Sequence, residues 1–205
     1  MSKSSTSTSL TDRAKAKALK IQKSLDSPFN EILPFLYLGS DPRRHSKDID
    51  VLSYLKLHKF THRIDLTTHP FESPELTTRF LTVPDDPSRK ITLLLFSQLE
   101  EACNFIDQAR QCNNVKLLIH CKAGVSRSAT LVIYYLLTRM YVGEYNLAQI
   151  LEIVRQARPI VSPNHGFMHA LCDIETNTLK LQPSIDPTLY KKYRMGNPNY
   201  YRVMQ

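Results

Sequence analysis

The segment Lys116–Thr130 constrains the fold of this 205-residue chain most, because a short apolar run passes through a tight polar loop into a second apolar run. The first run ends at His120 and is short enough to predict a buried strand. The loop contains Gly124. The second run, Ala129–Leu137, is apolar nearly all round and predicts a buried core helix. The segment therefore predicts a strand, a loop and the start of a helix.

Other short β-type segments precede this strand, and helical patterns lie between and after them. Apolar residues at helical spacing predict a helix through Leu99–Ile106 and another that starts at Leu147, with Asn146 as its N-cap. Interleaved strands and helices indicate an α/β fold: a single domain with a central, mostly parallel twisted sheet flanked by helices. The predicted strands lie near Ile32–Tyr37, Thr61–Leu66, Arg79–Val83 and Lys116–His120.

The two ends of the chain differ in composition from its middle. Residues 1–28 are dominated by Ser, Thr and Lys, so we expect a flexible basic arm that cannot bury enough apolar surface to fold. Apolar residues at helical spacing from Leu10 to Leu25 leave an amphipathic helix, bound to a membrane or a partner, as the alternative. The expected domain is 29–180, and the polar, proline-containing segment 181–205 is an expected C-terminal tail.

Composition limits the partners and the compartment. The net charge of +8 favours anionic partners, but no nucleic-acid recognition motif accompanies it, so we predict no nucleic-acid binding. No apolar run approaches the roughly 20 residues that span a bilayer, which excludes integral membrane association. Four cysteines without regular spacing or a signal segment predict free thiols in the cytoplasm or nucleus. The oligomeric state is not indicated.

The predicted loop has the chemistry of an anion site. Successive N–H groups that turn inward ahead of a helix N-terminus bind a phosphate and stabilise a thiolate, which can lower a cysteine pKa from about 8.5 to between about 3.5 and 7.5. We therefore predict that Cys121 is a nucleophile and that the planar fork of Arg127 binds two phosphate oxygens. Ser128 is expected to donate its hydroxyl to the Cys121 sulfur. The predicted phosphate-binding residues are Lys122, Ala123, Gly124, Val125, Ser126 and Arg127.

Two roles are open for His120. It can orient the loop through a hydrogen bond, or it can be an ordinary buried histidine. A role as general base is not needed, because a thiol of low pKa is already ionised.

The run His120-Cys121-x-x-Gly124-x-x-Arg127-Ser128 resembles the signature of the dual-specificity phosphatase family. The resemblance extends from Asn30 to Glu175. Within this range, Ile32–Ser40 is similar to the opening strand of the family, and Arg158–Phe167 is similar to the segment that joins two of its helices. It implies the cysteine-phosphatase fold and a small atypical member of the family. It also implies hydrolysis of phosphotyrosine and phosphoserine/phosphothreonine in protein substrates through a cysteinyl-phosphate intermediate, with no metal and no other cofactor.

The resemblance also implies a general acid upstream of the loop, normally an Asp on a loop after a strand. Asp85 and Asp86 are the candidates. In several small members the acid stands two residues before a proline and six before an apolar residue, a pattern that fits Asp85 with Pro87 and Ile91. We predict Asp85 as the acid and keep Asp86 as the reserve.

Two alternatives for the function remain. Lys122 directly follows the cysteine, as in lipid phosphatases that resemble this family, so a phosphoinositide or other lipid substrate is one alternative. A non-catalytic phosphoprotein-binding module is the other, although such proteins usually lack the Cys or the Arg. Asp65 stands where many family members carry Asn, a difference that can alter contacts beneath the loop.

Overall fold

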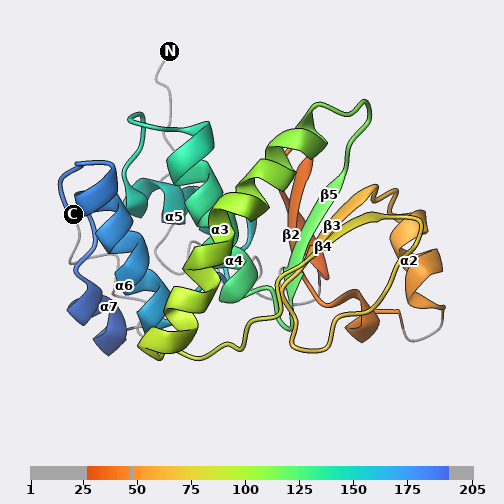
Figure 1. Ribbon diagram of the computed structural model, residues 1–205, viewed down its shortest axis with the longest axis horizontal. Helices are drawn as coiled ribbons and strands as arrows, with labels where there is room; N and C mark the ends of the chain where they lie inside the picture. Colours follow the sequence, from red (N-terminus) through yellow and green to blue (C-terminus); the bar gives the residue numbers. More distant parts are fainter. Residues whose placement is uncertain (1–26, 47–48, 194–205) are drawn as a thin grey trace, which may run out of the picture.

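A computed structural model describes residues 27–46 and 49–193 and contains one five-stranded sheet (Figure 1). Its strands are β1 (Phe29–Leu33), β2 (Leu36–Ser40), β3 (His62–Asp65), β4 (Thr77–Phe80) and β5 (Leu117–Cys121). The spatial order is β1-β2-β5-β3-β4, in which only β1 runs antiparallel to its neighbour. The predicted α/β fold with a mostly parallel sheet is therefore confirmed.

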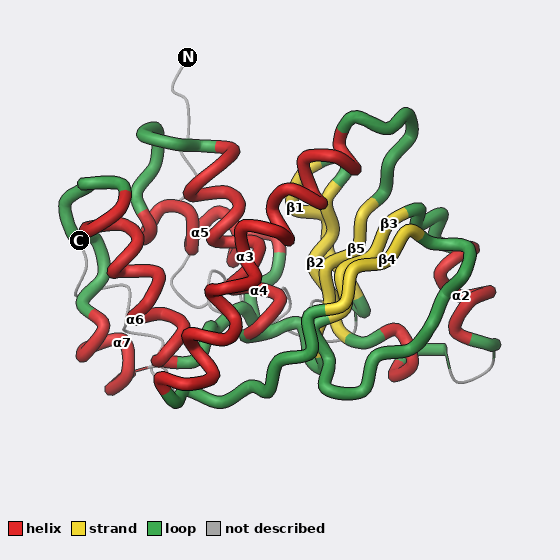
Figure 2. The backbone as a smooth tube through the Cα atoms, in the orientation of Figure 1, coloured by secondary structure: helices red, strands yellow, loops and turns green. Residues whose placement is uncertain are grey.

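The helices lie unequally on the two sides of the sheet, as Figure 2 shows. They are α2 (Val51–Leu57), α3 (Arg89–Arg110), α4 (Arg127–Tyr135), α5 (Leu147–Ala157), α6 (His165–Asp173) and α7 (Pro187–Tyr193). α4 and α6 each continue into a π-helical turn, and a short 3-10 turn covers Pro42–Arg44. α2 lies on one side of the sheet, and the other helices lie on the opposite side. Within the described residues, every helix is too short or too polar to cross a membrane.

β5 lies in the middle of the sheet, and its two faces pack against two different hydrophobic clusters. Leu117 and Ile119 are fully buried in the large cluster that includes the helices, whereas Leu118 points to a smaller cluster with Leu55 and Phe60. This alternation is the period of two expected for a strand with both faces covered. As a result, the carboxyl end of β5, where Cys121 lies, is held from both sides of the sheet.

The predicted segment Ile32–Tyr37 is wrong as a single strand. The structure divides it between β1 and β2, which form an antiparallel hairpin with a turn at Pro34 and Phe35. Proline has no N–H for a sheet hydrogen bond and favours turns, so it interrupts the apolar run. The predicted N-cap of α5 is confirmed, because Asn146 and Gln149 form a reciprocal capping box.

The packed core continues past residue 180. Ile185 and Tyr190 are almost fully buried, and the Tyr190 hydroxyl donates to the Pro163 carbonyl at 2.7 Å. Isolated apolar residues between prolines have no recognisable period, which is why the sequence indicated a polar tail here. Most of the predicted N-terminal arm and residues 194–205 lie outside the described residues.

The packing of α7 leads to a stability prediction. Tyr190→Ala should lower the free energy of unfolding by about 3 kcal/mol, because it empties a buried aromatic site. Tyr190→Phe should cost about 1 kcal/mol, the typical value of one hydrogen bond. Lys191→Ala, at an exposed position on the same helix, is the control and should change stability by less than about 0.5 kcal/mol. Urea unfolding of the full chain measures all three, and equal stability of Tyr190→Ala and the control would contradict the packing.

Candidate active site

The loop that joins β5 to α4 is supported from outside by a buried arginine. Arg158 is 1% exposed, and it donates from Nε to the Gly124 carbonyl at 2.9 Å and from Nη2 to the Ala123 carbonyl at 3.2 Å. Its Nη1 donates to Asn30 Oδ1 at 2.6 Å, which ties the loop to β1. Burial lowers the pKa of Arg158 to about 10, so the guanidinium remains charged at neutral pH.

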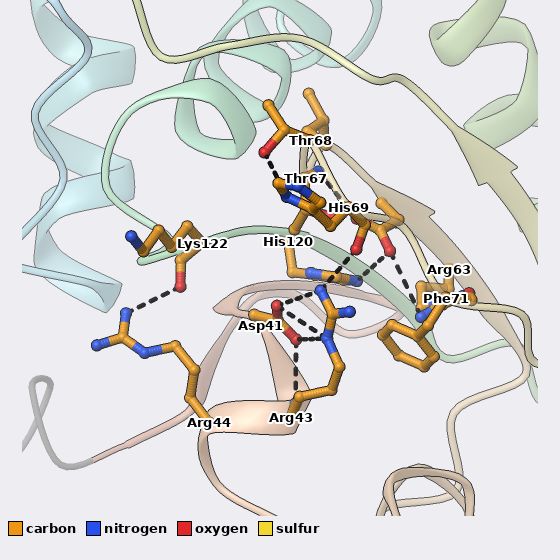
Figure 3. Close-up of polar contacts among 12 residues, drawn as sticks. Asp41, Arg43, Arg44, Arg63, Thr67, Thr68, His69, Phe71, His120 and Lys122 are labelled. Carbon is orange, nitrogen blue, oxygen red and sulfur yellow. Dashed lines mark hydrogen bonds and ion pairs between the residues drawn. The ribbon is translucent and has the colours of Figure 1, made fainter.

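The carbonyls on either side are also held outward. Arg44 Nη1 donates to the Lys122 carbonyl at 3.0 Å, a contact that Figure 3 shows, and the Ser162 N–H donates to the Val125 carbonyl at 2.9 Å. In a trans peptide the carbonyl and the next N–H point in opposite directions. Four consecutive carbonyls held outward therefore leave the following N–H groups facing the concave side of the loop, the arrangement of an anion-binding nest.

Gly124 meets a geometric requirement that other residues cannot meet. Its φ is +67°, in the left-handed region, and a Cβ at this position would overlap the backbone of Gly39 on β2. The loop therefore packs directly against the neighbouring strand.

Cys121 lies at the bottom of this loop and is 1% exposed. Burial alone would raise the pKa of its thiol. The charge of Arg127, the Ser128 hydroxyl and the N–H groups of Ser128 and Gly124 oppose burial, and together they lower this pKa below its ordinary value. The Ser128 hydroxyl lies 3.2 Å from the sulfur. The loop thus surrounds a sulfur that ionises more readily than a free cysteine.

Arg127 is held by two carbonyls that come from different parts of the chain. Its Nη1 donates to the Leu66 carbonyl at 2.9 Å and to the Val83 carbonyl at 2.8 Å. Its Nε has no hydrogen-bond partner among the described residues, although it is buried. The side chain is therefore fixed at one end and retains donors for a ligand.

Asp85 and Asp86 have different surroundings. Asp85 Oδ1 accepts from Ser126 Oγ in the loop and from Asn164 Nδ2 at the start of α6, both at 2.8 Å. Asp86, which is exposed like Asp85, accepts from the Ser88 N–H at 2.6 Å, just before α3. Of the two predicted candidates, Asp85 is therefore the one that contacts the loop.

His120 is fully buried in β5, and neither of its ring nitrogens has a hydrogen-bond partner within the described residues. Its Nε2 lies 3.7 Å from Asp65 Oδ2. Burial lowers the pKa of His120 to about 4, so the ring is neutral at pH 7. The predicted hydrogen bond to the loop is not found, and the structure favours the reading of a buried histidine.

Sequence reasoning missed the supports of the loop. Arg158 and Asn164 were noted only within a segment of family resemblance, because a side chain that binds distant backbone carbonyls or a distant carboxylate leaves no local pattern. Arg44 was not singled out at all. Across residues 27–46 and 49–193, no group of three or more His, Cys, Asp or Glu side chains is placed to hold a metal ion.

Comparison with known proteins identifies relatives of this chain. The family description "Dual specificity phosphatase, catalytic domain" matches residues 36–177. A probable dual specificity protein phosphatase of Dictyostelium discoideum is 34% identical over 152 residues, which make up 74% of this chain and 65% of that protein. Dual specificity protein phosphatase 5 of Rattus norvegicus is 35% identical over 157 residues, which make up 77% of this chain but only 38% of the rat protein.

Solved structures show the same fold. The crystal structure of DUSP15 is 31% identical with a TM-score of 0.61, covering 74% of this chain and 90% of that one. Human tyrosine phosphatase-like serine/threonine/tyrosine-interacting protein is 28% identical with a TM-score of 0.61, covering 74% and 97%. Since the family description spans most of the chain and includes both the loop and Asp85, this chain belongs to the dual specificity phosphatase family and contains its catalytic domain.

Proposed function

We propose that this protein is a phosphatase that hydrolyses phosphotyrosine and phosphoserine or phosphothreonine in protein substrates. The observation that carries the proposal is the thiol of Cys121, held within a loop of inward N–H groups beside Arg127. The relatives named dual specificity protein phosphatases support it. Because all four cysteines are free thiols, we further propose that it acts in the cytoplasm or nucleus, where thiols stay reduced.

The proposed reaction has two steps. In the first, the Cys121 thiolate attacks phosphorus, the bond from phosphorus to the leaving oxygen breaks, and Asp85 gives that oxygen a proton. In the second, water attacks the phosphocysteine, Asp85 takes a proton from the water, and the sulfur–phosphorus bond breaks. Ser128 donates to the departing thiolate, and inorganic phosphate leaves.

The loop and Arg127 stabilise the charge on the phosphoryl oxygens throughout both steps. The N–H groups that follow the outward carbonyls are oriented by donors of the protein itself, so they need little reorganisation during the reaction. Arg127 adds a planar pair of donors that suits two phosphoryl oxygens. The anchored Oδ1 of Asp85 leaves its second carboxylate oxygen to exchange the proton.

Two other functions use the same site. Lys122 lies in the loop and is exposed, so a phosphoinositide or other lipid phosphate is an alternative substrate. The human structural neighbour named as a phosphatase-like interacting protein raises the alternative of phosphoprotein binding without catalysis. The presence of Cys121, Arg127 and Asp85 together favours catalysis.

Hydrolysis of a small aryl phosphate without metal is the first test. We expect activity that vanadate inhibits and that Cys121→Ser abolishes, because a serine hydroxyl is not ionised at neutral pH. A panel of phosphopeptides and phospholipid vesicles then separates the substrate classes. Turnover of lipids alone would overturn the protein-phosphatase assignment. Phosphopeptide binding without turnover by the intact protein would favour the binding module.

Asp85 and Asp86 form a matched pair for testing the acid. Asp85→Asn should lower kcat by about a hundredfold or more on phosphoserine peptides, whose leaving oxygen needs protonation, and by less on an aryl phosphate with an acidic leaving group. Asp86→Asn should leave kcat unchanged. Equal rates for the two variants on phosphoserine peptides would show that Asp85 is not the acid.

The pKa of Cys121 predicts how its reactivity depends on pH. A thiolate forms as pH rises through the pKa, so alkylation by iodoacetamide should already be fast below the ordinary thiol range and should slow only as pH falls further. Ser128→Ala should move the midpoint to higher pH. Cys112→Ser removes the exposed thiol, and burial raises the pKa values of Cys103 and Cys172 to about 12, so they do not compete. A midpoint at or above that of a free cysteine would contradict the lowered pKa.

A further inference from the structure

A buried ion pair lies at the end of β3, the strand that pairs with β5. Arg63 Nη1 and Asp65 Oδ2 are 3.7 Å apart, and both side chains are fully buried. Such a pair is costly to desolvate and is weak evidence for stability by itself. Asp65 directly precedes Leu66, whose carbonyl accepts a hydrogen bond from Arg127, and this position indicates a second role for Asp65.

The backbone between Asp65 and Thr67 carries the acceptor that holds Arg127. Asp65 Oδ1 accepts from the Thr67 N–H at 2.9 Å and closes a tight turn around Leu66. The Leu66 N–H donates to the His120 carbonyl at 2.9 Å. With the peptide units on both sides fixed, the Leu66 carbonyl points at Arg127 Nη1, 2.9 Å away.

We propose that Asp65 is a positioning residue for Arg127: its Oδ1 fixes the Leu66 carbonyl, and Arg63 balances its buried charge. The inference rests on the proposed function, because Arg127 matters only if the loop binds phosphate. The two roles of Asp65 use different properties of the carboxylate, an acceptor oxygen and a negative charge, and they are separable by mutation.

Arg63 and Asp65 interact mainly through their charges, because the hydrogen bond that Arg63 donates goes to another residue. Arg63 Nη2 donates to the Phe71 carbonyl at 2.5 Å, and the guanidinium lies 3.8 Å from the centre of the Phe71 ring. Arg43 approaches the same ring and donates to the His69 carbonyl at 2.8 Å (Figure 3). By contrast, Arg63 Nη1 and Asp65 Oδ2 have no hydrogen-bond partner among the described residues.

Removing both charges together should therefore leave the turn intact, provided that an acceptor remains at position 65. Asp65→Asn keeps an amide oxygen for the Thr67 N–H but removes the carboxylate that pairs with the buried Arg63, which leaves Asp41 and Glu72 as the remaining anions that act on this cation. Arg63→Met with Asp65→Asn removes that charge. Arg63→Met with Asp65→Leu also removes it, with a side chain close in shape to Asn, but has no acceptor. The two double variants therefore differ chiefly in the hydrogen bond to Thr67.

The experiment compares these variants of the full chain by melting temperature, by kcat and KM on p-nitrophenyl phosphate, by vanadate affinity and by the pH profile of Cys121 alkylation. Asp65→Asn should melt roughly 10 °C lower than the unsubstituted protein, and Arg63→Met should restore most of this loss. The leucine double variant should have a kcat/KM about tenfold below that of the asparagine double variant. It should also bind vanadate more weakly and alkylate with a midpoint at higher pH, since Arg127 lowers the pKa of Cys121.

Equal kcat/KM, vanadate affinity and alkylation midpoint in the two double variants would overturn the proposal and leave Asp65 with a structural role alone. If the leucine variant does not fold, Asp65→Ala in the Arg63→Met background is compared in the same way. Failure of the proposed function is seen separately, as absence of turnover in the unsubstituted protein. In that case vanadate affinity and Cys121 alkylation still test the placement of Arg127.

Discussion

A backbone loop binds phosphate only while its N–H groups stay turned inward, and here that orientation depends on donors that hold the carbonyls from outside. Arg158 alone donates hydrogen bonds to two consecutive loop carbonyls, and it also donates to Asn30 on β1, which connects the loop to that strand. Arg44 donates a hydrogen bond to the carbonyl of Lys122. All of these donors belong to the protein itself, so the fold fixes the orientation of the loop, which is the physical basis of preorganisation.

Placing Arg158 beneath the loop requires the fold that surrounds it. An arginine in the interior is costly to desolvate, and its donors must all find acceptors. The loop carbonyls, Asn30 and Ser27 supply them, so the cation and the loop satisfy each other. β5 supplies the rigid base, since its two faces pack against separate hydrophobic clusters.

Most of the site residues predicted from the sequence lie on one continuous segment, whereas Asp85 lies on a separate loop and was predicted only from the family resemblance. Cys121, Gly124, Arg127 and Ser128 lie on one strand, loop and helix start, so spacing and chemistry together indicated their arrangement. Arg158 could not be found in this way, because it binds carbonyls that any residue carries. The hairpin at Pro34 and the buried part of α7 were missed for a related reason. A turn inside an apolar run and single buried residues among polar ones depend on tertiary contacts and have no period of their own.

Four of the arginines around the site fall into two groups with different electrostatic effects. Arg43 and Arg63 each pair with an aspartate, Asp41 and Asp65, so most of their field is cancelled nearby. Arg127 and Arg158, among the described residues, bind carbonyls or an amide oxygen and pair with no carboxylate. Dipolar acceptors satisfy donors without neutralising charge, so these two guanidiniums keep their field, and each interacts with the Cys121 sulfur. Of these four arginines, the two without an aspartate partner are therefore the ones whose charge acts on the Cys121 thiol.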